Sequence, residues 1–153
     1  MPLRLAGRLP RRRGPVGDAC PIDRTLQVVG TRSAFLLLRE AFYGATRFDD
    51  LVRLTGFTEA VAASRLKELV GAGLLERRPY REPGQRTRQE YVLTDRGRDL
   101  LPVLVALGEW SRTHSPELGG PTLSHDGCEA DVRLTLRCAA GHDVTEDELV
   151  VTG

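Results

Sequence analysis

The stretch GFTEAVAASRLKELVGAGLLERRPY, residues 56–80, limits the fold more than any other part of the chain. It begins with a turn signal, continues with a helical pattern, breaks at a Gly-Ala-Gly sequence and passes into a basic, strand-forming segment. Thr58 is a good N-cap, and Glu59 stands in the first turn, where a negative charge is favourable. The stretch therefore predicts a helix over about residues 58–72 that is followed directly by a β-strand.

This helix has two different faces on a wheel of about 100° per residue. Ala62, Leu66, Leu69 and Val70 share one side, which is predicted to face the core. The opposite side is small and polar, and such a surface suits the major groove of DNA because short side chains allow close approach to base edges. Two packed helices with a solvated outer face would give the same pattern without a partner. The candidate DNA-binding residues of this helix are Thr58, Ala60, Ala63, Ser64, Arg65 and Lys67.

A basic β-hairpin is predicted over about residues 74–94. Pro83 and Gly84 stand in its middle, at the positions where a type II turn favours them. Residues 77–88 hold five arginines against Glu82 alone, so the hairpin could clamp the phosphate backbone as a wing. An exposed hairpin kept soluble by charge is the alternative. The arginines expected to contact DNA are Arg78, Arg86 and Arg88.

Three helices are predicted before the residue 58–72 helix. Two of them flank residues 30–32, and Pro21 suits the first position of the earlier one, while Gly44 ends the later one. Thr46 followed by Asp49 resembles a capping box for a third, short helix. A short helix, a glycine turn and a longer helix form a helix-turn-helix arrangement.

The segment after the hairpin predicts a helix with a broad apolar face. Thr94 is an apt N-cap, and Pro102 predicts either a kink or a later start. The apolar surface exceeds what one small domain can cover, so pairing with a second copy would hide it. Packing wholly within the monomer is the alternative. The candidate dimerisation residues are Leu100, Leu104, Leu107 and Trp110.

The motifs CPIDRTLQVVGTRSAFLLLREAFYGATRFDDL, GLLERRPY and YVLTDRGRDLLPVLVALGEW, in this order and with the residue 58–72 helix between them, resemble the HxlR-type family of bacterial winged-helix transcriptional regulators over residues 20–114. The resemblance implies an α+β, mostly α winged helix-turn-helix that acts as a homodimer. Repression is the expected output, with activation as the alternative. The resemblance also implies that the residue 58–72 helix enters the major groove and that the hairpin is the wing. This chain departs from the family pattern at two positions. The family commonly has tryptophan where this chain has Ser33, and it often has a basic residue where this chain has Ala60.

Cys20 directly precedes Pro21, so it is expected at the N-cap, where the helix dipole and Arg24 would favour the thiolate. Some HxlR-type regulators are thiol sensors with a cysteine at the matching position. The resemblance therefore implies that Cys20 is a redox switch for an oxidant or a small electrophile. An idle thiol is the alternative.

Residues 115–153 are predicted to form a small, acidic, β-rich appendage. They carry 2 basic against 8 acidic side chains, whereas residues 1–114 carry 20 against 13. Two potential ligand pairs with the spacing of a zinc ribbon flank an alternating strand, and zinc is the expected metal. A metal-free appendage whose cysteines act as small hydrophobic residues is the alternative. The candidate ligands are His125, Cys128, Cys138 and His142.

The start of the chain, residues 1–19, is expected to be a flexible basic tail, since glycines, prolines and five arginines cannot form a core. Neither a membrane span nor a secretory signal is predicted, which favours the cytoplasm. No Gly-rich phosphate loop, Gly-x-Ser-x-Gly or His-Glu-x-x-His motif is present, so the chain is not expected to be an enzyme. The predicted function is sequence-specific binding of double-stranded DNA, with a winged-helix module for protein or small ligands and weak DNA affinity as the alternative.

Overall fold

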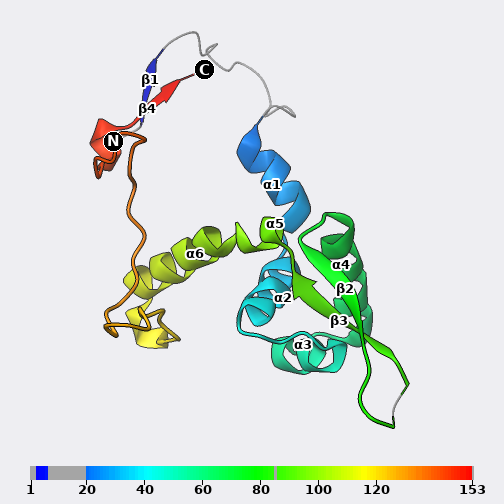
Figure 1. Cartoon of the computed structure of the whole chain (residues 1–153). Helices are drawn as coiled ribbons and strands as arrows, with labels where there is room; N and C mark the ends of the chain where they lie inside the picture. Colours follow the sequence, from blue (N-terminus) through cyan, green and yellow to red (C-terminus); the bar gives the residue numbers. More distant parts are fainter. Residues whose placement is uncertain (1–2, 7–19, 85, 153) are drawn as a thin grey trace. The chain divides into compact units, whose positions relative to one another are not determined.

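The computed structural model describes residues 3–6, 20–84 and 86–152. The chain divides into two compact units, of which one spans Asp18–Leu107 and the other combines the first residues with Gly108–Gly153 (Figure 1). This division falls inside the last long helix, whereas the sequence analysis placed a boundary after residue 114. Across the three described ranges, every helix is too short or too polar to cross a membrane.

The larger unit begins with two helices whose starts follow the sequence signals. Helix α1 (Pro21–Val29) has Cys20 at its N-cap in an extended conformation and proline at its first position. Helix α2 (Arg32–Phe42) is capped by Thr31, whose Oγ1 accepts a hydrogen bond from the backbone N–H of Ala34 at 3.2 Å. Pro21 and the apolar positions on either side of residues 30–32 predicted both helices, whereas the cap at Thr31 was not predicted.

The beginning of α3 (Phe48–Thr55) corrects one expectation. Thr46 does not cap this helix, because the N-cap is Arg47 and no side chain closes the first turn. The cause is tertiary: the Tyr91 N–H donates to the Thr46 carbonyl oxygen at 2.7 Å, and Arg47 forms an isolated antiparallel bridge with Glu90. Pairing with the hairpin therefore holds Thr46 and Arg47 in extended backbone up to the start of the helix.

Helix α4 (Glu59–Gly71) is the long helix predicted from residues 56–80. Gly56, with φ of +69°, ends α3 in the left-handed conformation that glycine adopts without strain. Thr58 then caps α4, since its side chain accepts a hydrogen bond from the Val61 N–H. A short helix, a glycine turn and a longer helix result, as Figure 1 shows for α3 and α4.

The core of this unit lies where α2, α3, α4 and the hairpin meet. Its largest fully buried side chains are leucines, and Tyr91 and Leu93 contribute from the hairpin. Burial of each such side chain stabilises the fold by about 1.5–3 kcal/mol. The fully buried leucines are Leu37, Leu38, Leu51, Leu66, Leu69 and Leu75.

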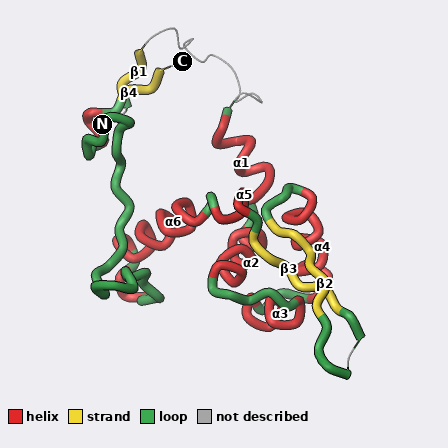
Figure 2. The backbone as a smooth tube through the Cα atoms, in the orientation of Figure 1, coloured by secondary structure: helices red, strands yellow, loops and turns green. Residues whose placement is uncertain are grey.

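The predicted hairpin consists of β2 (Leu75–Tyr80) and β3 (Arg88–Leu93), an antiparallel pair in which Leu75 lies opposite Leu93 and Tyr80 opposite Arg88 (Figure 2). The loop between them contains Pro83 and Gly84 as a turn, and the φ of +76° at Gly84 is the value that a type II turn needs. The fold class is thus mostly helical with a small antiparallel sheet, as predicted.

The segment after the hairpin forms two helices, α5 (Asp95–Arg98) and α6 (Leu101–His114). Thr94 caps α5 by accepting a hydrogen bond from the Gly97 N–H at 3.0 Å. Pro102 occupies the first turn of α6, where its missing N–H breaks no hydrogen bond. Of the two outcomes expected from Pro102, the later start is the one observed.

The smaller unit is an open chain of short elements. Strand β1 (Arg4–Ala6) pairs in parallel with β4 (Val150–Thr152), and two short 3-10 helices, η1 (Pro116–Leu118) and η2 (Glu146–Glu148), lie between α6 and β4. The expectation of a tail without structure is therefore wrong at residues 4–6, while residues 1–2 and 7–19 lie outside the described ranges. None of the described side chains from Gly108 onward is buried.

Candidate functional site

The outer face of α4 has the low profile that its sequence predicted. Ala62, Leu66 and Leu69 are fully buried beneath it. The side chains that point away from the core are small or short, apart from one lysine and two glutamates. The exposed residues among the candidates are Thr58, Ala60, Ala63, Ser64 and Lys67.

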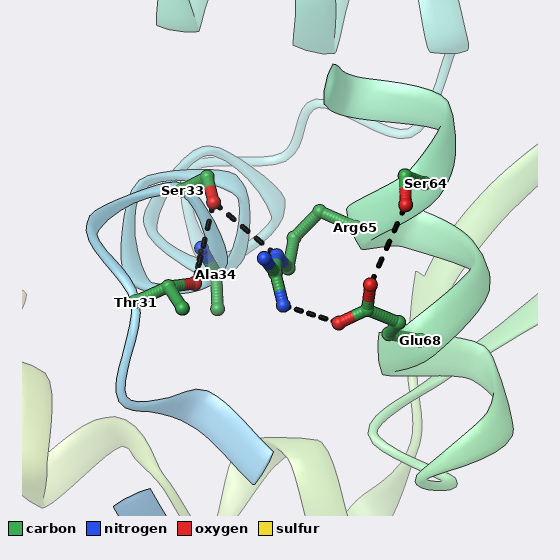
Figure 3. Close-up of polar contacts among 6 residues, drawn as sticks. All are labelled: Thr31, Ser33, Ala34, Ser64, Arg65 and Glu68. Atoms are coloured by element: carbon green, nitrogen blue, oxygen red, sulfur yellow. Dashed lines mark hydrogen bonds and ion pairs between the residues drawn. The ribbon is translucent and has the colours of Figure 1, made fainter. Parts of the chain in front are cut away.

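Arg65 has a more specific environment than the wheel suggested (Figure 3). Its Nε donates a hydrogen bond to Ser33 Oγ on α2 at 3.2 Å, and its guanidinium forms an ion pair with Glu68, one turn further along α4. Glu68 also accepts a hydrogen bond from the Ser64 hydroxyl at 3.4 Å. Arg65 is accordingly half-buried and held from both sides, while Glu68, which the sequence analysis did not select, joins two candidate residues.

The wing arginines also differ from one another in their surroundings. Arg78 pairs with Glu76 on its own strand, and Arg88 lies 3.6 Å from Asp49 of α3. Arg86, by contrast, makes no ion pair within the described chain, although it lies in the loop of the hairpin. Arg86 is thus the candidate wing residue whose charge is least compensated.

The loop end of the wing is tied to the start of α3 by Arg47, the N-cap residue of that helix. Its guanidinium forms an ion pair with Glu82 and stacks over the Tyr80 ring at 5.0 Å from the centroid. The hydrogen bond that Arg47 donates to Glu82 and the negative charge of Glu82 raise the pKa of Arg47 above its ordinary value, so this side chain stays protonated. Arg47 therefore orients the wing, a role that its position in the sequence did not indicate.

The apolar face of α6 is only partly covered by its own chain. Leu100 packs against the core and Leu104 is half-buried, whereas Leu107 and Trp110 are exposed, Trp110 to 66%. Helix α1 adds a second exposed apolar stripe, in which Ile22 and Leu26 are 69% and 52% exposed. Their spacing of four residues places Ile22 and Leu26 side by side on the helix.

Cys20 is half-buried at the N-cap of α1, and the next residue, Pro21, lines a hollow. The hollow has a volume of about 470 Å³, within the range of small-molecule sites. Its deeper lining is aliphatic and includes the buried Val29 and Leu74, and its exposed lining includes Arg24, Arg96 and Asp99.

The four candidate zinc ligands form two separate pairs. His125 Nδ1 lies 3.3 Å from Cys128 Sγ, and Cys138 Sγ lies 3.6 Å from His142 Nδ1. Within the described residues no three histidine, cysteine or acidic side chains gather in a group that could hold a metal. As placed, each pair supplies half of the four ligands that a structural zinc site needs.

Comparison with known proteins places these features in a family. The model of the HxlR-like helix-turn-helix family matches residues 28–118. An uncharacterized HTH-type transcriptional regulator of Mycobacterium tuberculosis is 42% identical over 127 residues, which cover 81% of this chain and 79% of that protein. One from Synechocystis is 32% identical over 117 residues, which cover 76% of this chain and 79% of that protein.

Solved structures agree with the sequence comparison. The crystal structure of PA1607, described as a candidate transcription factor, matches with a TM-score of 0.75 and 33% identity, covering 84% of this chain and 90% of that one. The redox regulator HypR in its reduced form matches with a TM-score of 0.57 and 28% identity, covering 65% of this chain and 97% of that one.

Proposed function

The chain belongs to the HxlR-like helix-turn-helix family of transcriptional regulators, and from this premise we propose that it binds duplex DNA as a homodimer, with α4 in the major groove and the β2–β3 hairpin against the backbone. The family and its relatives are regulators, so the prediction that the chain is not an enzyme is confirmed. The observation that carries the DNA-binding mode is the exposed, low-profile face of α4 directly before a hairpin with an uncompensated arginine, Arg86.

Dimerisation is supported by the apolar residues that the chain leaves exposed on α1 and α6. A homodimer with two-fold symmetry would bury Ile22, Leu26, Leu107 and Trp110 and would present two copies of α4 to one duplex. A dimer seated on a promoter excludes other proteins from it, which makes repression the simplest output. Chromosomal DNA lies in the cytoplasm of bacteria, and we place the protein there.

An effector response is proposed at the start of α1. The related HypR is named a redox regulator, and Cys20 stands at the N-cap of α1, directly before Pro21, which lines the hollow together with Arg24 and Arg96. An unsaturated carbonyl compound would add to the Cys20 sulfur: a carbon–sulfur bond forms as the carbon–carbon π bond breaks, and the thiol proton moves to the neighbouring carbon. Such an adduct would change the surface of α1 that we assign to the dimer.

Selection of bound duplexes from a random pool by the full-length protein tests the DNA-binding proposal. We expect enrichment of a sequence with two related half-sites about one helical turn apart, and an affinity that falls steeply as salt rises. The same titration after treatment with a small electrophile tests the effector, with Cys20→Ser as the control. If no sequence is enriched at low salt, with or without a thiol reductant, the proposed function is wrong.

The second candidate is a winged-helix module that binds a protein or a small ligand and has weak DNA affinity. It is favoured by the charge of α4, in which Arg65 and Lys67 are balanced by Glu59 and Glu68. A protein of this kind would show a shallow dependence of DNA affinity on salt, because few phosphates would be neutralised. The salt titration therefore separates the two candidates.

A further inference from the structure

We infer that Glu68 is a specificity-determining residue of α4. Its carboxylate accepts the hydrogen bond that the Ser64 hydroxyl donates, so that Ser64 can only accept a hydrogen bond from the DNA, and it keeps Arg65 turned away from the DNA. This inference rests on the proposed function, because it concerns how α4 reads bases in the major groove. Its basis is the connected set of polar side chains in Figure 3, which runs from the start of α2 to the outer face of α4.

The carboxylate of Glu68 determines which atom donates in its two contacts. An ionised carboxylate only accepts hydrogen bonds. Ser64 therefore donates its single proton to Glu68 across 3.4 Å, and Arg65 donates from its guanidinium. The Ser64 oxygen is left with lone pairs, and because this side chain is exposed on α4, those lone pairs are what a DNA base can meet.

Arg65 is anchored from the opposite side by α2. Its Nε donates to Ser33 Oγ at 3.2 Å, and Ser33 Oγ lies 3.2 Å from Thr31 Oγ1, which itself accepts from the Ala34 N–H. The proton of Ser33 can then point to Thr31, so every contact in the chain has one donor and one acceptor. This arrangement holds Arg65 against the body of the domain, and its side chain is only 24% exposed.

A serine that can only accept distinguishes bases that a freely rotating serine does not. In the major groove adenine N6 and cytosine N4 donate, whereas guanine O6 and thymine O4 accept. A serine hydroxyl that is free to rotate can bond to either kind. With its proton committed to Glu68, Ser64 selects a donor base, and guanine or thymine at that position would leave two acceptors facing each other.

Glu68 also lowers the general attraction of α4 for DNA. It compensates Arg65, so Lys67 is the basic side chain of α4 that makes no ion pair in the described part of the chain. Nonspecific affinity depends on the number of phosphates neutralised by basic residues. A helix with one uncompensated cation contributes little to that affinity, which leaves discrimination to the contacts with bases.

The contrasting interpretation is that Arg65 and Glu68 are an ordinary surface ion pair at i, i+3, of the kind that contributes almost nothing. The two interpretations differ in one measurable property. Loss of a surface ion pair would change the affinity for every DNA sequence equally. Loss of a residue that fixes the direction of the Ser64 proton would change the base preference at one position in each half-site.

The test compares Glu68→Ala with Glu59→Ala in the full-length protein, using duplexes selected from a random pool. Both variants remove one negative charge from the exposed surface of α4, but Glu59 takes no part in the set of contacts in Figure 3. We expect Glu59→Ala to change affinity alike for all duplexes. Glu68→Ala should reduce discrimination between donor and acceptor bases at one position by about threefold to tenfold, the value of one net hydrogen bond.

Two further variants separate positioning from stability. Glu68→Gln has nearly the same shape and can donate as well as accept, so it should also relax the preference, even if Glu68→Ala fails to fold. Ser33→Ala releases Arg65 without touching the outer face of α4, and it should alter preference at the same position. A purely structural role would lower the melting temperature and leave base preference unchanged.

The outcomes distinguish this inference from the proposed function. If the wild type selects a sequence and both Glu68 variants select the same one with the same discrimination, the role of Glu68 is refuted while DNA binding stands. If the wild type enriches no sequence, the proposed function fails and the role of Glu68 fails with it.

Discussion

Gly97 shows how a single backbone contact joins the recognition region to the helices that follow it. The α5 backbone passes so close to the Leu74 carbonyl that an added Cβ would lie well inside van der Waals distance of that oxygen, and 3.1 Å from Leu93 Cδ2. Backbone cannot move aside as a flexible side chain can. We expect Gly97→Ala to reduce the free energy of unfolding by about 2 kcal/mol or more, measured by denaturant titration.

Gly71 provides the matched control. It is the last residue of α4, has no positive φ, and an added Cβ there would meet nothing within 4 Å. Gly71→Ala should leave stability unchanged or raise it by about 0.5 kcal/mol through the better helix propensity of alanine. Equal losses in the two variants would show that the contact with Leu74 is not the cause.

At the residue scale, the sequence predicted which side chains are exposed better than it predicted what they contact. The faces of α4 followed from periodicity, because burial of one side of a helix repeats every 3.6 residues. The hydrogen bond of Arg65 to Ser33 did not, since it joins residues 32 positions apart and depends on how α2 packs against α4. The contacts of Glu68 were also missed, although its place three residues after Arg65 is a signal for an ion pair.

At the scale of elements, the wing is expected to contribute through charge. Arg86 lies in the hairpin loop without an ionic partner in the described chain, so its loss should weaken binding to every duplex equally. For Arg86→Ala we expect the slope of log affinity against log salt to fall by about 0.9, the value for one phosphate contact. Fluorescence anisotropy at several salt concentrations measures this slope.

Arg98→Ala is the control for the wing, because it removes the same charge from α5. The hairpin loop precedes β3 and α5 follows it, and β3 has six residues and is therefore about 20 Å long. Arg98→Ala should therefore leave the salt slope within error of the wild type. A slope that falls equally in both variants would mean that overall charge, and not the wing, determines the salt dependence.

The boundaries of elements were predictable where a local signal decides them. Pro21 and Thr58 predicted the starts of α1 and α4, and Pro102 predicted the late start of α6, whereas the separate helix α5 was not predicted. Thr46 misled because hydrogen bonding to the hairpin determines the backbone there. Pairing of β1 with β4 joins opposite ends of the chain, and three-residue strands so far apart leave no recognisable pattern.

At the scale of the whole molecule, the appendage raises the question of what holds it together. Segments of this size without a core usually depend on a metal, a disulfide or a partner. Because the four candidate ligands form two separate pairs, they do not fit one tetrahedral zinc site as placed. We expect less than half a zinc ion per chain in the purified protein, measured by plasma mass spectrometry.

A variant distinguishes structural zinc from incidental metal. Cys128→Ser with Cys138→Ser should leave the melting temperature unchanged, because neither thiol is buried. One zinc per chain, lost in this double variant together with several degrees of melting temperature, would show that the pairs come together in solution and would restore the zinc-ribbon interpretation.

Dimerisation is the property on which both proposals about DNA depend. Leu107 is exposed on the apolar face of α6, and a glutamate there would place an unpaired charge in the interface that we propose. We expect Leu107→Glu to sediment as a monomer under conditions in which the wild type sediments as a dimer. Its affinity for a two-half-site duplex should fall by about 100-fold, since the second half-site no longer adds to binding.

Thr113→Glu, which changes charge on another exposed side of α6, should keep both the dimer and the affinity. The dimer would be refuted if the wild type sedimented as a monomer and bound a duplex with two half-sites no more tightly than a duplex with one. Only coupled subunits can bind the pair more tightly than a single half-site.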